Sequence, residues 1–116
     1  ELPKDEKNKI ALFCSVPNNS VISMHDVDTV YSIPVLLNKQ KVDKTILSKL
    51  KIRTTNPKLN DWKRVIKAKL LPEREVNVPF VGKYTELKDS YKSINEALEH
   101  AGIKNKAQVN INFVEA

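Results

Sequence analysis

A strand, a helix and a second strand follow one another in the last third of the chain, and this order restricts the fold more than any other feature. The first strand is predicted at Val78–Tyr84, with a turn at Gly82. The second is predicted at Val109–Phe113, where apolar side chains alternate with asparagines. A unit of about 40 residues in this order implies two parallel strands joined by a right-handed crossover. Pro79 lacks a backbone donor, so an edge or irregular position is expected for the first strand.

The helix of this unit has signals for both of its ends and an apolar face. Asp89 or Ser90 can cap its first turn, and Gly102 is placed to end it. One apolar stripe is predicted along it, formed by Tyr91, Ile94, Ala97, Leu98 and Ala101. We therefore expect this stripe to pack on the sheet.

The first half of the chain predicts short helices around one strand. A first helix is expected from Pro3, with Ile10, Phe13 and Cys14 on one face. A strand is predicted at Val21–Met24, and it leads into the polar loop 25–28. Two further helices are expected, one capped by Ser32 and opened by Pro34, the other capped by Asp43.

Polar loops that follow strand ends are where α/β proteins place their ligands. The chain has two such places, after Val21–Met24 and after Val78–Tyr84. The predicted fold class is therefore α/β, with strand-helix pieces of two nucleotide-handling or amide-handling domains.

The middle of the chain, residues 51–75, differs from both flanks in charge. It holds eight lysine or arginine residues against three acidic ones, whereas residues 1–50 hold seven against six and residues 76–116 hold five against five. One helix is predicted between Pro57 and Pro72, and Trp62 is expected to anchor it to a neighbouring domain. We expect residues 1–50 and 76–116 to belong to two domains, with residues 51–75 as the linker.

Several kinds of site are not predicted by this sequence. Cys14 is expected to be a buried structural thiol, because neither His25 nor His100 lies in a recognisable setting for a catalytic pair. Gly82 and Lys83 lack the rest of a phosphate-binding loop. No apolar run approaches the roughly 20 residues of a membrane span, and no secretory leader is seen, so a cytoplasmic location is expected.

Two ordered blocks of the chain resemble the CTP synthase family. The end of that family's synthase domain is resembled by Lys9–Cys14, Val21–Asp28 and Val30–Leu37. The start of its glutamine amidotransferase domain is resembled by Val81–Tyr84, Leu87–Ser93 and Ala97–His100. The resemblance implies the ends of two parallel-sheet domains, a P-loop-like synthase domain and a class I glutaminase domain, joined by a helical linker.

The resemblance also implies an activity. The enzymes of this family use ATP and Mg²⁺ to phosphorylate the uracil O4 of UTP, and then replace the phosphate with ammonia released from glutamine. GTP activates the reaction, CTP inhibits it, and the enzymes are tetramers. The phosphate loop, the metal ligands and the catalytic cysteine would lie outside residues 1–116, so no catalytic or metal-binding residue is expected within this chain and the chain alone is expected to be inactive.

Five residues are given roles by the resemblance. Lys9 matches a lysine at the UTP and CTP site, where an ammonium neutralises a triphosphate. Val27 matches a position that offers a backbone group to ATP, with Asp26 beside it. Tyr91 and Lys92 match a region linked with GTP. Without the resemblance, Lys9 would be a solvated helix lysine and Asp26 a turn residue.

A second hypothesis comes from the charge alone. Residues 51–75 would then form a small non-catalytic basic module that docks on an acidic partner or on RNA. Binding to phosphates would weaken steeply with added salt. Trp62 is the one aromatic residue of this segment, which disfavours a surface for stacking bases, and the family resemblance implies no nucleic-acid partner.

Overall fold

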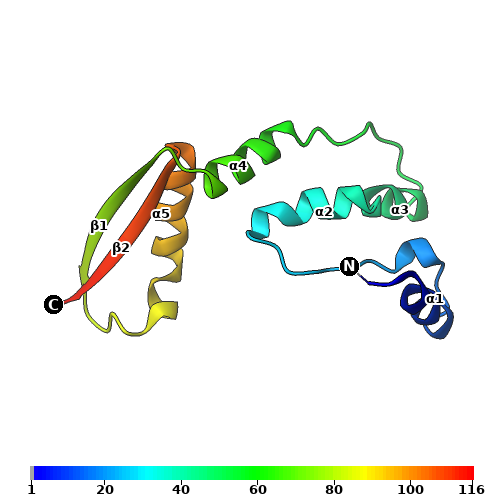
Figure 1. Ribbon diagram of the computed structural model, residues 1–116, viewed down its shortest axis with the longest axis horizontal. Helices are drawn as coiled ribbons and strands as arrows, with labels where there is room; N and C mark the ends of the chain where they lie inside the picture. The colour runs from blue at the N-terminus through cyan, green and yellow to red at the C-terminus, as the bar shows by residue number, and fades with distance from the viewer. Residues whose placement is uncertain (1) are drawn as a thin grey trace. The chain divides into compact units, whose positions relative to one another are not determined.

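The computed structural model describes residues 2–116, with Lys88 by its backbone alone, and the chain divides into two compact units (Figure 1). The first unit extends to Asn60 and the second begins at Asp61. The mixture of helices with a parallel sheet confirms the predicted α/β class. Across the described residues, no helix has both the length and the apolar character needed to cross a membrane.

Short helices make up the first unit. They are α1 (Lys4–Phe13), η1 (Asn18–Ser20), η2 (Val30–Ser32), α2 (Ile33–Lys39) and α3 (Val42–Lys49). α1 begins after Pro3 and carries Asp5 and Glu6 in its first turn, where negative charge favours the positive end of a helix. The core is small: Ala11 and Val42 are its buried apolar residues among those described.

The predicted strand at Val21–Met24 is wrong. These residues belong to no sheet, and the two strands that the structure describes both lie in the second unit. The backbone of Ser23 is instead paired with the side chain of Gln40. An apolar run of this length favours an extended backbone, but a strand also needs a neighbouring strand to pair with.

Two expectations about the first unit's side chains are also wrong. Cys14 is exposed rather than buried, because it lies at the end of α1 beside Phe13, which is itself 86% exposed. Asp43 does not cap α3, which begins one residue earlier at Val42. Lys41 precedes the helix with a left-handed φ of 59°, and Asp43 accepts a hydrogen bond from Asn38 at 3.2 Å.

The second unit contains one helix before the sheet and one that covers it. Its elements are α4 (Asn60–Leu70), β1 (Arg74–Gly82), η3 (Lys88–Tyr91), α5 (Lys92–Lys104) and β2 (Ala107–Glu115). The strands are parallel and in register from the pair Arg74 and Ala107 to the pair Gly82 and Glu115, as the sequence predicts for a crossover unit. In the described part of the chain, each strand has one neighbour.

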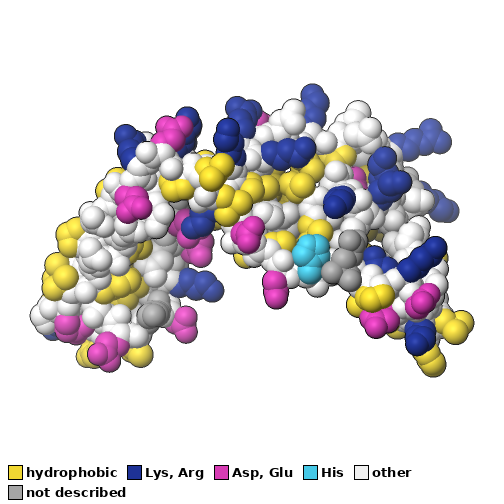
Figure 2. All heavy atoms as spheres, in the orientation of Figure 1, with side chains coloured by type: hydrophobic (Ala, Val, Ile, Leu, Met, Phe, Trp, Pro, Cys, Tyr) yellow, Lys and Arg dark blue, Asp and Glu magenta, His cyan; other side chains and the backbone are white. Residues whose placement is uncertain are grey.

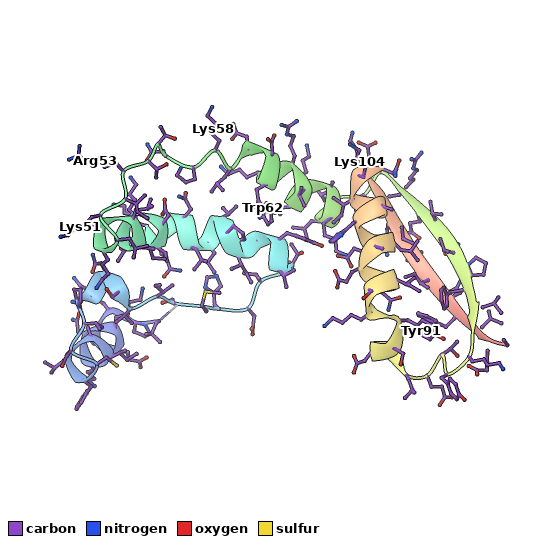
Figure 3. All side chains as sticks on the ribbon, turned by 180° about the vertical axis from the view of Figure 1, so that it is seen from behind. Lys51, Arg53, Lys58, Trp62, Tyr91 and Lys104 are labelled. Atoms are coloured by element: carbon purple, nitrogen blue, oxygen red, sulfur yellow. The ribbon has the colours of Figure 1, made fainter. Side chains whose placement is uncertain are left out.

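α4 confirms the helix predicted between the two prolines. Asp61 pairs with Arg64 within the helix, and Lys69 reaches Glu99 of α5 at 2.9 Å. Figure 3 shows Trp62 on this helix. The residue is 38% exposed. The docking of Trp62 on a neighbouring domain stays a prediction.

Gly102 lies inside α5 and does not end it, which corrects the prediction. The helix continues to Lys104 and is followed by Asn105. A Cβ atom at position 102 would come within 2.6 Å of the carbonyl oxygen of Ala107 and 2.9 Å of Cγ2 of Val109. At Gly102 the helix therefore lies so close to β2 that a side chain would not fit.

The packing face of α5 is rotated from the predicted stripe. Half-buried or buried residues of the helix are Asn95, Leu98, Glu99, Gly102 and Ile103, whereas Ala97 and Ala101 are exposed and Ile94 is 39% exposed. Leu98 is four residues before Gly102, on the same side of the helix. The face that contains Gly102 approaches the sheet because it has no side chain at the closest point.

Candidate functional site

Residues 24–28 of the first unit form a stretch whose backbone polar groups are free for a ligand. Within residues 2–116, no hydrogen bond uses a backbone N–H or C=O group of this stretch. Asp26 is exposed and Val27 is half-buried. Five successive residues with open donors and acceptors can recognise the edge of a heterocycle through main-chain groups alone.

The amino-terminal end of this stretch is fixed by Ser23. Its N–H donates to Oε1 of Gln40 at 2.9 Å, and its C=O accepts from Nε2 of Gln40 at 2.8 Å. Its hydroxyl accepts from the N–H of Leu2 at 3.2 Å. Ser23 is 5% exposed, so these bonds hold a buried polar residue in place.

The other end of the stretch is fixed by Thr29. Its hydroxyl accepts from the N–H of Tyr31 at 3.4 Å, and its C=O accepts from the N–H of Ser32 at 2.9 Å. Thr29 is 7% exposed. Residues 24–28 are therefore an open loop held between two buried hydroxyl residues.

A hollow lies beside this loop. Its volume is about 600 Å³, and it is lined by Leu2, Pro3 and Ile10 on one side and by residues 21–25 on the other. Lys9, the neighbour of Ile10, is exposed on α1 and forms no ion pair with a carboxylate of the described chain. The first unit thus combines a free cation, an apolar hollow and a loop of free backbone groups.

Tyr91 and Lys92 lie in the second unit, at the start of α5. The ring of Tyr91 packs against Phe80 and Phe113, with ring centres 4.9 and 5.9 Å away, and its hydroxyl donates to the carbonyl of Lys83 (Figure 3). Lys92 is exposed. The structure brings these two residues together with the loop after β1, but the phenol of Tyr91 is already bonded to that loop.

Glu115, at the end of β2, holds the same loop. Its carboxylate accepts from the N–H of Tyr84 at 2.9 Å, and from the N–H and hydroxyl of Thr85 at 3.0 and 2.6 Å. The hydroxyl bond, followed by the two N–H bonds, lowers the pKa of Glu115 below its ordinary value of 4.5.

This carboxylate makes the loop sensitive to acid. Because the pKa of Glu115 is lowered by folding, its contribution to stability is present above the unfolded pKa and is lost as pH falls through the folded value. We expect the amide chemical shifts of Tyr84 and Thr85 to titrate together, with a midpoint below 4.5. Two-dimensional NMR between pH 7 and pH 2 measures this, and Glu115→Gln should abolish the transition. A midpoint above 4.5 would contradict the role of the three bonds.

Sequence reasoning missed Gln40, Thr29 and Glu115. Gln40 and Ser23 are 17 residues apart, and Glu115 and Thr85 are 30 apart, so no local spacing connects them. Thr29 does carry a local signal, since a threonine that precedes a helical turn is a common capping residue. Through residues 2–116, no three side chains among His, Cys, Asp and Glu gather as metal ligands would.

Residues 1–52 match the protein family described as the CTP synthase N-terminus. The matched range contains α1, α2 and α3, and with them Lys9, Asp26 and Val27. This part of the chain is therefore similar to the N-terminal region of CTP synthases. Residues 81–100, which resemble the start of the amidotransferase domain, lie outside the match, and that part of the resemblance stays a prediction.

Proposed function

We propose that this chain is part of a CTP synthase, a ligase that makes CTP from UTP by ATP-dependent amination with ammonia from glutamine. Residues 1–50 would supply the end of the synthase domain, residues 51–75 the linker, and residues 76–116 the start of the amidotransferase domain. The observation that carries the proposal is the family match over residues 1–52, which contains both the exposed cation Lys9 and the open loop of residues 24–28. The proposed location is cytoplasmic and the proposed assembly is a tetramer.

In this proposal the two parts of the first unit hold two nucleotides. The ammonium of Lys9 binds the triphosphate shared by UTP and CTP, where a compact positive charge offsets the phosphate charges. The free backbone groups beside Asp26 and Val27 bind ATP. Neither role requires a side chain to react, so this part of the chain binds and orients the substrates.

In this proposal, the ligands of the Mg²⁺ that the reaction needs lie outside this chain. Asp26 and Asp28 are two exposed carboxylates in one loop, and the described residues contain no group of three candidate ligands. Mg²⁺ favours octahedral oxygen coordination that is shared with substrate phosphates. Other residues of the enzyme would coordinate the metal, whose charge would offset that of the ATP phosphates.

In the second unit, the proposal concerns the activator GTP. Lys92 is an exposed cation at the first residue of α5 and would face a phosphate group. Tyr91 would contribute by shaping that loop, because its hydroxyl is bonded to Lys83 and its ring is packed between two phenylalanines. Glutamine and the ammonia it releases would be handled by residues outside this chain.

The activity itself gives the first test. The full-length protein that contains these residues should form CTP from UTP only when ATP, Mg²⁺ and either glutamine or ammonia are all present. CTP release can be followed by its absorbance or by chromatography. If CTP does not form when free ammonia is supplied, the proposed function is wrong, since ammonia bypasses the glutaminase.

The charge of Lys9 gives the second test. We expect Lys9→Ala in the full-length protein to raise the KM for UTP about tenfold or more, because one charge-assisted contact to phosphate contributes about 1.5–3 kcal/mol. The KM for ATP should change little. Lys4→Ala is the matched control, since Lys4 is an exposed lysine on the same helix. If the two substitutions change the KM for UTP equally, Lys9 does not bind UTP.

A second candidate function is favoured by the positive charge of the linker. Lys51, Arg53 and Lys58 project from the segment between α3 and α4 (Figure 3), and Figure 2 shows further lysine and arginine side chains over α4. This segment would dock on an acidic partner or on RNA without catalysis. Titration with salt tests this candidate against the first, because binding to phosphates falls steeply with ionic strength, whereas a CTP synthase is recognised by CTP formation that requires ATP and a source of ammonia.

A further inference from the structure

The side chain of Gln40 forms the two backbone hydrogen bonds that a neighbouring strand would otherwise provide to Ser23. Its carboxamide gives one acceptor to the N–H of Ser23 and one donor to the C=O of Ser23, at 2.9 and 2.8 Å. A neighbouring strand would satisfy a residue in the same way, with one bond to each of its backbone groups. The extended backbone around Ser23 is thus fixed by a single side chain 17 residues further along the chain.

Gln40 is held firmly by its own surroundings. It caps the end of α2, where its N–H donates to the carbonyl of Leu36 at 3.3 Å. The next residue, Lys41, has a left-handed φ of 59° and leads directly into α3. Val42, the first residue of α3, is 7% exposed, so the connection between α2 and α3 is buried at this residue.

The position of Ser23 decides where the open loop begins. Ser23 is 5% exposed, and residues 24–28 follow it without any backbone hydrogen bond to the rest of the described chain. Asp26 and Val27 are three and four residues beyond Ser23, so a small shift or rotation of Ser23 moves both. Thr29 fixes the far end, and the carboxamide of Gln40 fixes the near end.

We propose that Gln40 is a positioning residue for ATP, and that it acts by holding Ser23 and thereby the free backbone groups of residues 24–28. This role rests on the proposed function, because the ligand of the loop is ATP only if the protein is a CTP synthase. The arrangement of backbone donors must be correct before the nucleotide arrives, since ordering a loose loop on binding reduces affinity.

The first measurement concerns only the two hydrogen bonds between Gln40 and Ser23, which we call the clamp, and it needs no enzyme activity. In the purified chain, Gln40→Met keeps the length of the side chain but removes both hydrogen bonds. We expect the amide of Ser23 to exchange with solvent about tenfold faster, since two neutral hydrogen bonds are lost. Gln108→Met is the matched control, because Gln108 is exposed on β2 and its side chain bonds only to Asn110 among the interactions described. Unchanged exchange at Ser23 would overturn the clamp.

The second measurement uses the full-length enzyme. Gln40→Met should raise the KM for ATP about tenfold, while the KM for UTP and kcat at saturating ATP stay within about twofold. A purely structural role would instead lower kcat or raise both KM values together. If the KM for ATP is unchanged in an active Gln40→Met enzyme, the positioning role is overturned.

A second variant keeps the test decisive if Gln40→Met does not fold. Gln40→Glu preserves the acceptor for the N–H of Ser23 but places a carboxylate against its carbonyl. It should raise the KM for ATP in the same selective manner, and a normal KM would overturn the proposal. Absence of CTP formation by the unsubstituted protein would overturn the proposed function and the nucleotide role with it, whereas the exchange result for Ser23 would still report on the clamp.

Discussion

Replacing Gly102 with alanine will destabilise the second unit by about 1–3 kcal/mol, the usual cost of overpacking a close contact. The new Cβ would lie 2.6 Å from the carbonyl oxygen of Ala107, which is backbone and cannot rotate away. In an unhindered helix the same substitution would stabilise by about 1 kcal/mol, because alanine is the better helix former. The sign of the change therefore tells whether the close contact is present.

Urea unfolding followed by the NMR signals of β2 measures this effect. Ser93→Ala is the control, since Ser93 is exposed on the same helix and its substitution should change stability by less than about 0.5 kcal/mol. Gly102→Val should be worse than Gly102→Ala, because a branched side chain adds bulk at the same point. A higher urea midpoint for Gly102→Ala would show that α5 does not pack on β2 through this face.

Replacing Phe113 with alanine will destabilise the same unit by about 2–3 kcal/mol, somewhat less than the 3–5 kcal/mol typical of a fully buried phenylalanine. Phe113 is half-buried and packs against the rings of Phe80 and Tyr91, with centres 5.5 and 5.9 Å away. These contacts fill the space between the start of α5 and the carboxyl ends of the strands.

The chain contains a matched control for this second substitution. Phe13 is 86% exposed, so Phe13→Ala removes the same atoms without opening a cavity and should change stability by less than about 0.5 kcal/mol. Thermal unfolding of both variants, monitored by circular dichroism, gives the comparison. Equal losses would mean that the aromatic cluster does not stabilise the sheet.

The sequence was most informative where the signals are local. The alternation of apolar residues and asparagines at Val109–Phe113, and the prolines around Trp62, predicted elements that the structure contains. The parallel pairing of β1 with β2 also followed, because the length of the crossover leaves few other arrangements.

Long-range contacts decided the features that were predicted wrongly. Val21–Met24 has the composition of a strand, but its partner is the side chain of Gln40. α5 carries apolar residues on two faces, and the close approach of Gly102 to Ala107 selected the face that the apolar stripe did not predict. In both cases the structure depends on a contact with a distant residue, and the periodicity of the sequence does not reveal such a contact.

The same limit applies to the site. Lys9, Asp26 and Val27 were predicted through a resemblance, and all three lie within the range of the family match, but their roles stay predictions. Their physical setting was not foreseen, because the free backbone of residues 24–28 is recognised only once the bonds at Ser23 and Thr29 are known. A residue proposed to act by positioning another residue, as Gln40 is, cannot be identified from its amino-acid type alone.

The two edges of the small sheet differ in their tendency to self-associate. β1 carries a proline at position 79, which interrupts the row of donors that an incoming strand would need. β2 has no charged side chain from Ala107 to Val114, and among the described residues no strand pairs with its outer edge. Concentrated samples should therefore aggregate through β2, and a lysine at the exposed position 112 would act as a gatekeeper against fibril growth.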